Sequence, residues 1–311
     1  MASRETFNQE LASLKAFQDR DDKHLIKLLA TLEVKKARTT TYYLLFPWAE
    51  GNLWEFWERH ADPKSRFDRC LWMAEQIYQL AQALMLVHNE RLQQLKEMKD
   101  TIDESKQELY GRHGDIKADN ILWFGGSNEE LVLADFGLGR LNSKYSRSGV
   151  NPKLVDKSAT YRAPEFDLSG GTISRRSDIF SFGCMCLEFV TWYLEGWEAV
   201  SDKFPEYRLE ADIHNQNADI FFTIEEYKTE EERAIIKPKV IQWIDRLKGS
   251  RACSSYILQF LELIEERMLD PDSSQRIKSP ELVKKLELLS VSCRRNSSFY
   301  KEYSNELLPA S

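Results

Sequence analysis

The sequence lacks the features that mark secreted and membrane-spanning proteins. No apolar run is long enough to cross a bilayer, and the polar start Met1-Ala-Ser-Arg-Glu5 has no apolar signal-peptide core. The five cysteines form no Cys-x-x-Cys pair, and Cys184 and Cys186 lie in an apolar run, a pattern typical of small buried thiols. We therefore expect an intracellular protein in a reducing compartment, the cytoplasm or the nucleus.

Basic residues are also in deficit. The 43 Lys and Arg against 50 Asp and Glu give a net charge of −7, so there is no electrostatic reason to expect binding to nucleic acid or to an anionic membrane. Hydrophobic residues, in contrast, make up 42% of the 311 residues, which is enough for a sizeable core. This length corresponds to about two average domains or to one large two-lobed domain.

The front of the chain predicts one helix followed by extended segments. Phe7, Leu11, Leu14 and Phe17 recur at helical spacing, and Glu10 sits beside the apolar face that they form. Residues 24–29 lead into an extended segment, and residues 41–46 are rich in strand formers. After residues 47–51, an amphipathic pattern over residues 53–57 predicts a short helix.

A long helix and a charged segment follow. Apolar residues at helical spacing predict a continuous helix over residues 67–89. The charged segment of residues 90–110 keeps a short apolar stripe of Leu92, Leu95 and Met98. We expect it to be a solvated helical extension, and a helix that docks a partner is the alternative.

The chemistry of the chain is concentrated in His113-Gly-Asp-Ile-Lys-Ala-Asp-Asn120 and in Asp135-Phe-Gly137. Asp115, Lys117, Asn120 and Asp135 supply two carboxylates, one ammonium and one amide, the set of groups that a Mg·ATP phosphotransfer site needs. Two short strands, at residues 121–124 and 131–134, surround a Gly-rich turn. This predicted hairpin puts Asn120 before its first strand and Asp135 after its second, so the two can face each other.

Further signatures follow downstream, at Ala163-Pro-Glu165 and at Ser177-Asp-Ile-Phe-Ser-Phe-Gly183. Together with the earlier motifs, they resemble the eukaryotic Ser/Thr protein kinase family. The resemblance implies an α+β, two-lobed fold with an incomplete small N-terminal lobe and a complete, mainly helical large lobe. Its parts are a partial small lobe at 1–46, a hinge at 47–51, the large lobe at 52–290 with its helical insertion at about 90–110, and a polar tail at 291–311.

The resemblance also implies roles for the catalytic residues. Asp115 would orient the substrate hydroxyl and accept its proton, and Lys117 would neutralise charge on the γ-phosphate of ATP. Ser158 falls where the family places a hydroxyl that braces these two side chains. Asn120 and Asp135 would hold Mg²⁺, and the substrate would be a protein serine or threonine.

Other positions match the parts of the family that bind ATP or hold the site together. Phe46 matches the gatekeeper, Leu122 the floor of the adenine site, and Glu10 the helix-C glutamate. The adenine-contacting hinge corresponds to Pro47, Trp48, Ala49 and Glu50. Asp178 would fix the backbone of the catalytic loop, Arg276 would pair with Glu165, and residues 279–289, capped by Ser279, would form the last helix.

Two departures from the family pattern shape the expected activity. Gly114 stands where many family members carry an arginine that pairs with a phosphate on the activation loop. No Gly-x-Gly-x-x-Gly loop and no Val-Ala-Ile-Lys strand precede the predicted helix, so we expect this chain to phosphorylate weakly or not at all. The alternative is a pseudokinase-like module that binds nucleotide or protein. An aminoglycoside- or choline-kinase-like phosphotransferase shares His-Gly-Asp but lacks the downstream signatures.

Overall fold

The computed structural model of the protein describes residues 4, 7–8, 11, 14, 22–36, 39–63, 68–89, 112–126, 129–135, 160–211, 217–226 and 232–301. The predictions for Glu10, Phe17, Ser158 and the segment 90–110 lie outside these residues. The described residues 4, 7, 8, 11 and 14 are all helical, as the spacing at the front of the chain predicts.

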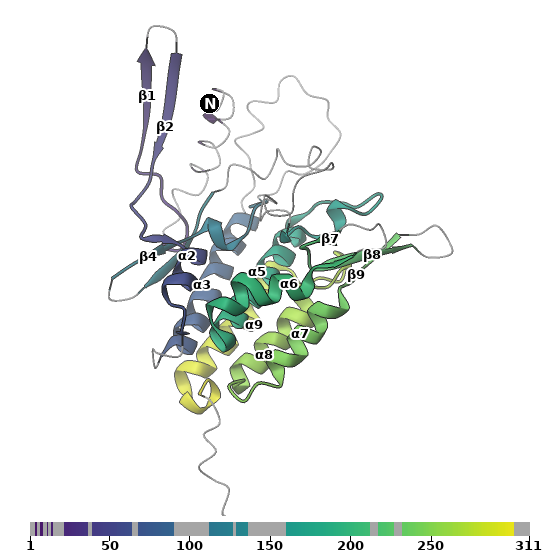
Figure 1. Ribbon diagram of the computed structural model, residues 1–311. Coiled ribbons are helices and arrows are strands. Elements are labelled where there is room, and N and C mark those ends of the chain that lie inside the picture. The colour runs from purple at the N-terminus through teal and green to yellow at the C-terminus, as the bar shows by residue number, and fades with distance from the viewer. Residues whose placement is uncertain are drawn as a thin grey trace, which may run out of the picture.

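An antiparallel hairpin follows the first helix. It consists of β1 (Ala30–Lys36) and β2 (Thr39–Leu45), paired from Ala30↔Leu45 to Lys36↔Thr39. Every residue of β1 is exposed, and the hairpin extends away from the helical body (Figure 1). One side contact comes from the first helix, where the Phe7 ring stacks on Tyr42 with the ring centroids 4.7 Å apart.

A short link joins this front part to the small sheet of the body. His24 O accepts a hydrogen bond from Leu133 N at 2.8 Å, and Ile26 N donates to Leu133 O at 3.0 Å. Leu25 thereby forms a parallel bridge with Leu133. Because Leu133 lies two residues before Asp135, the link also reaches the edge of the candidate site.

The small sheet confirms the predicted hairpin around the Gly-rich turn. Its order is β3-β4-β5, and all of its pairings are antiparallel. The helix that follows β3 begins with a capping box, in which Glu55 N donates to Asn52 Oδ1 at 2.9 Å and Asn52 N donates to Glu55 Oε2 at 3.0 Å. These elements are β3 (Gly51–Asn52), α2 (Leu53–Arg59), β4 (Ile121–Phe124) and β5 (Glu130–Leu133).

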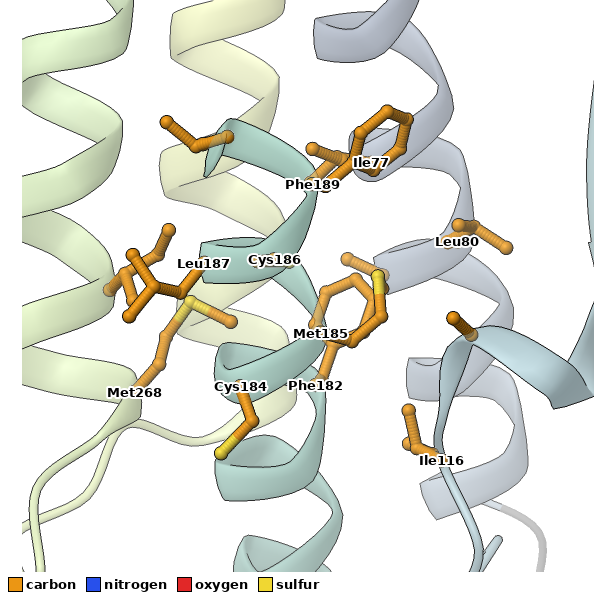
Figure 2. Packing of buried hydrophobic residues seen from close by; sticks show 14 of the residues in the cluster. Ile77, Leu80, Ile116, Phe182, Cys184, Met185, Cys186, Leu187, Phe189 and Met268 are labelled. Atoms are coloured by element: carbon orange, nitrogen blue, oxygen red, sulfur yellow. The ribbon is translucent and has the colours of Figure 1, made fainter. Parts of the chain in front are cut away.

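The centre of the body is α5 (Arg175–Glu195). Its N-cap is Ser174, whose hydroxyl accepts from Arg176 N, and its C-cap is Gly196, whose φ of 83° suits glycine. Buried apolar side chains of α5 pack between α3 (Arg69–Asn89) on one side and the C-terminal helices on the other (Figure 2). Among the described helices, none is both long and apolar enough to cross a bilayer.

The polar region after α5 could not be placed from the sequence, and the structure resolves it into short elements. Two small hairpins, β6 with β7 and β8 with β9, follow the helical turns η6 and α6. The elements are η6 (Ala199–Lys203), α6 (Phe204–Arg208), β6 (Glu210–Ala211), β7 (Asn217–Ala218), β8 (Phe222–Glu226), β9 (Glu232–Ile236) and α7 (Pro238–Lys248).

The last helix, α9 (Ser279–Arg295), packs along α3 and corrects two predictions. It continues beyond Leu289, and Cys293 and Tyr300 are buried, so the boundary placed at 290 is wrong because the polar helix residues keep one apolar face. The N-cap is Lys278 without a side-chain hydrogen bond, so the predicted Ser279 cap is also wrong. The other elements of this part are α8 (Ser255–Leu263), η7 (Ile264–Met268) and η8 (Ser297–Phe299).

Candidate functional site

The loop before β4 brings three predicted site residues together. Asn120 Nδ2 donates to Asp115 O at 2.7 Å and to Asp115 Oδ2 at 2.9 Å. Lys117 Nζ lies 3.1 Å from the same oxygen, Oδ2. The helical turn η3 (Ala118–Asn120) makes this approach possible, because it folds Asn120 back over the preceding loop. One carboxylate oxygen is therefore held by two donors, and the other oxygen, Oδ1, has its position fixed as a result.

A buried carboxylate on α5 holds the backbone of this loop. His113 N donates to Asp178 Oδ2 at 2.8 Å and Gly114 N donates to Asp178 Oδ1 at 2.9 Å, which confirms the prediction for Asp178. Burial by itself would raise the pKa of the Asp178 carboxyl. The hydrogen bond from His88, at 3.0 Å, and nearby positive charge outweigh burial, so the pKa of Asp178 is lowered.

His113 connects the loop to the residue before Asp135. Its Nε2 lies 2.9 Å from Ala134 O, and its Nδ1 lies 3.3 Å from Asp115 N. Burial lowers the pKa of His113, and a neutral ring with its proton on Nε2 can donate to the first group and accept from the second. The next residue, Gly114, has a φ of 85°, a conformation that glycine adopts without strain.

The predicted metal ligands lie at neighbouring ends of β4 and β5. Ala134 N donates to Asn120 O at 3.0 Å, so Asp135 follows directly after this contact. Asp135 has a φ of 64°, which is unusual for a residue other than glycine. Such a conformation costs free energy, and residues that adopt it cluster at functional sites.

This donor set fits Mg²⁺. The amide nitrogen of Asn120 donates to Asp115, so the amide oxygen is the atom of Asn120 that could bind a metal ion, and Asp135 adds an exposed carboxylate. Mg²⁺ prefers such oxygen atoms and usually keeps water and phosphate oxygens as its other ligands. The described residues contain no cluster of three or more His, Cys, Asp or Glu side chains that would form an all-protein metal site.

The predicted adenine-binding residues lie along one connection. In residues 46–50, the side chains of Trp48 and Glu50 are exposed and the other three are half-buried. Trp48 is 91% exposed, so no other described part of the protein covers its side chain. Glu50 N donates to Trp123 O at 2.9 Å, which ties this connection to β4 next to the half-buried Leu122.

A second buried ion pair fixes the segment that contains Ala163-Pro-Glu165. Arg276 donates from two nitrogens to the two carboxylate oxygens of Glu165, at 2.9 and 3.0 Å, which confirms the predicted pair. Ser177 Oγ donates to Glu165 Oε1 at 2.7 Å. Gly171 permits a close approach here, since a Cβ atom at that position would lie 2.2 Å from Glu165 O.

Sequence reasoning missed two groups that act on this site. His88 lies at the end of α3 and reaches Asp178, a contact between residues 90 positions apart that no local pattern signals. A cluster of the buried Tyr161, Glu188 and Arg208 with the half-buried Asp219 was also missed, because Arg208 and Asp219 belong to the region that the sequence could not place.

The comparisons with known proteins agree with this geometry. Proline-rich receptor-like protein kinase PERK7 of Arabidopsis thaliana is 43% identical over 79 residues, 25% of this chain and 11% of that protein. The LRR receptor-like serine/threonine-protein kinase RGI3 of the same plant is 40% identical over 85 residues, covering 25% and 8%. Probable serine/threonine-protein kinase fnkE of Dictyostelium discoideum is 36% identical over 80 residues, covering 25% and 6%.

These alignments span about a tenth or less of the relatives' own length. The family model of the protein kinase domain, in contrast, matches residues 1–286, most of the chain. This match confirms the α+β, kinase-like two-lobed fold implied by the motifs. The chain belongs to the eukaryotic protein kinase family.

Proposed function

We propose that the protein is a Ser/Thr protein kinase that transfers the γ-phosphate of ATP to serine or threonine hydroxyls of protein substrates. The observation that carries the proposal is the arrangement of Asp115, whose Oδ2 is held by both Lys117 and Asn120. A carboxylate fixed in this way presents its second oxygen at a defined position. A general base needs such a fixed oxygen in order to orient the substrate hydroxyl and to accept its proton.

The other residues around Asp115 support the same reaction. Lys117 places an ammonium beside the carboxylate, where it would neutralise charge on the transferred phosphoryl group. Asn120 and Asp135 would hold Mg²⁺, which when bound supplies further positive charge at the phosphates. We assign Ser158 the role of bracing Asp115 and Lys117, in line with its place in the family motif.

ATP would bind between the connection at residues 46–50 and β4. We assign the gatekeeper position to Phe46, adenine contacts to Pro47, Trp48, Ala49 and Glu50, and the adenine floor to Leu122. Glu10 is assigned to the helix-C glutamate. The short tie between Glu50 N and Trp123 O supports this arrangement, since it brings the connection beside the strand that carries Leu122.

A binding module without efficient transfer is the second candidate. No glycine precedes Gly51 in this sequence, so residues 1–46 cannot form the Gly-x-Gly-x-x-Gly loop whose backbone covers the phosphates in the family. We therefore expect weak transfer by this chain. The five free cysteines support a reducing compartment, and we propose the cytoplasm or the nucleus.

The test is Mg·ATP-dependent transfer of labelled phosphate to peptide mixtures whose only hydroxyl acceptor is serine, threonine or tyrosine. We expect slow labelling of the serine and threonine mixtures. Asp115→Asn should reduce it by about 10²- to 10⁴-fold, because the proton acceptor is lost. The matched control is Asp202→Asn, which changes an exposed aspartate on η6 and should leave the rate unchanged.

Binding of Mg·ATP, measured by calorimetry, separates the candidates. Binding without transfer by the unmodified chain would favour the binding module. Transfer to choline or to an aminoglycoside, but not to peptides, would contradict the protein kinase assignment. Transfer that survives in Asp115→Asn would contradict the role of Asp115.

A further inference from the structure

We infer that Arg208 is a positioning residue for the segment that binds the protein substrate. It acts through two chains of contacts that end at Tyr161 and Thr160. The inference rests on the proposed function: residues 158–165 resemble the substrate-docking loop of the protein kinase family, and we assign the Thr160-to-Glu165 segment this part in substrate binding. It concerns a residue that touches neither ATP nor the reacting hydroxyl.

Arg208 is held rigidly although it lies in a region of short elements. It ends α6, and its guanidinium lies over the Phe204 and Phe221 rings, 4.5 Å from each centroid. Its carbonyl accepts from Lys237 Nζ at 3.0 Å, and the same ammonium donates to Ala218 O at 2.8 Å. The side chain is 2% exposed, so the surrounding packing and these contacts fix its position.

The guanidinium joins two carboxylates from different elements. One of its nitrogens lies 3.0 Å from Glu188 Oε1, on α5, and 3.2 Å from Asp219 Oδ2. Arg208 Nε also donates to Asp219 Oδ1. The positive charge of Arg208 is therefore shared by the carboxylates of Glu188 and Asp219. Burial raises the pKa of Glu188, and the nearby Arg208 opposes this rise.

Both carboxylates also contact the residues that precede Ala163-Pro-Glu165. Glu188 Oε2 accepts a hydrogen bond from the Tyr161 hydroxyl, and Asp219 Oδ2 lies 3.5 Å from the Thr160 hydroxyl. Ser181 Oγ, also on α5, donates to Tyr161 O at 2.8 Å. These contacts hold the beginning of the segment.

The end of the same segment is held separately, by the pair of Glu165 with Arg276. The segment from Thr160 to Glu165 is thus fixed at both ends, and Arg208 organises only the first end. A guanidinium can bridge two carboxylates because its donors form a planar fork, whereas a lysine ammonium is a point charge. Arg208→Lys should therefore keep the charge but loosen Glu188, Asp219 and the two hydroxyl groups attached to them.

The kinetic test compares Arg208→Lys and Tyr161→Phe with two controls in the whole chain. The controls are Arg246→Lys, which alters an exposed ion pair to Glu195, and Tyr207→Phe, which removes an exposed hydrogen bond to Gln242. We expect the KM for the peptide substrate to rise about tenfold in the two test variants, the effect of losing one buried hydrogen bond. The KM for ATP should stay within about twofold, since no contact of the network reaches residues 46–50. An unchanged peptide KM in both variants would overturn the inference.

Hydrogen exchange gives a readout that does not need catalysis. In both test variants, amides of residues 160–166 should exchange about tenfold faster, while amides of α3 and α9 keep their protection. If the unmodified chain transfers no phosphate, the proposed function fails, and this exchange pattern still decides the role of Arg208. Exchange that is unchanged at 160–166, or that rises equally in α9, would show that Arg208 has no specific positioning role.

Discussion

Helix α5 and the β1–β2 hairpin differ sharply in how deeply their residues are buried. From Ser177 to Leu194 all residues of α5 except Ser181 are buried, and they pack against α3, α7 and α8. The hairpin exposes all of β1, and Leu32, with 52% of its surface exposed, and Tyr43, with 49%, share one uncovered face. Both regions are rich in apolar residues, so composition does not separate them.

The contrast shows which part of the site is fixed by packing. Helix α5 supplies Asp178 to the loop of residues 113–120, Ser177 to Glu165, and Glu188 and Ser181 to Tyr161. The hairpin is joined to the body through the link that pairs with Leu133. The residues that hold the site therefore belong to the most deeply buried helix, whereas few contacts among the described residues fix the position of the hairpin.

The largest expected effect is on the buried pair beside α5. Arg276→Met should lower the free energy of unfolding by about 3–5 kcal/mol, because it leaves the buried Glu165 carboxylate without its charged partner. Urea unfolding followed by circular dichroism measures this difference. The control is Arg267→Met, which breaks an exposed pair with Glu281 and should cost less than about 1 kcal/mol. Equal losses in the two variants would show that burial does not govern these pairs.

The second prediction compares the two regions directly by making the same substitution, leucine to alanine, once in each of them. Leu187→Ala removes a fully buried side chain of α5 that packs beside Met268 (Figure 2), and it should cost about 2–5 kcal/mol. Leu32→Ala in β1 should change the free energy of unfolding by no more than about 0.5 kcal/mol, since the side chain is largely exposed. A comparable loss in Leu32→Ala would mean that the face of the hairpin is covered in solution.

The smallest effect concerns the link between the two regions and depends on pH. His24 is buried, its Nδ1 lies 2.7 Å from Leu131 O, and its Nε2 has no hydrogen-bond partner among the described residues. Burial lowers its pKa from the ordinary value of 6.5, although the neighbouring Asp22 and Glu130 carboxylates oppose this shift and Lys23 adds to it. The native ring therefore resists protonation.

Below pH 6.5 the unfolded chain binds a proton at His24 that the native protein does not bind. Stability should therefore fall as the pH decreases from 6.5 toward the lower native value, by at most about 1.4 kcal/mol per pH unit for this group. His24→Gln should make the dependence shallower between pH 7 and pH 5, although His113, with its own lowered pKa, still contributes. Equal slopes in the variant and the parent would contradict the argument.

Local sequence patterns predicted the parts of the site that depend on neighbouring residues. The β4–β5 hairpin follows from two short apolar runs around a Gly-rich turn, and it places Asn120 near Asp135. The pairing of Glu165 with Arg276 and the anchoring role of Asp178 came from the family motifs, and the contacts confirm both. The chemical roles assigned to the site residues stay predictions, those of Asp115, Lys117, Asn120 and Asp135 as well as those of Glu10 and Ser158.

Long-range partners could not be predicted in the same way. Arg208 and Asp219 lie among short polar elements without a periodic pattern. Nothing in the sequence around His88 indicates its contact with Asp178, because only the fold brings the two residues together. The end of α9 was misjudged for a related reason, since its polar residues hide one apolar face that buries Cys293 against the body.

The motifs of the sequence, through their resemblance to the protein kinase family, were enough to predict the family and the α+β fold, and the family model confirms both. Tertiary structure decided which charges compensate one another. Asp178 with His88, and Arg208 with Glu188 and Asp219, pair across 90, 20 and 11 positions of the chain. These partners are brought together by the packing of separate elements, and one-dimensional spacing carries no information about that packing.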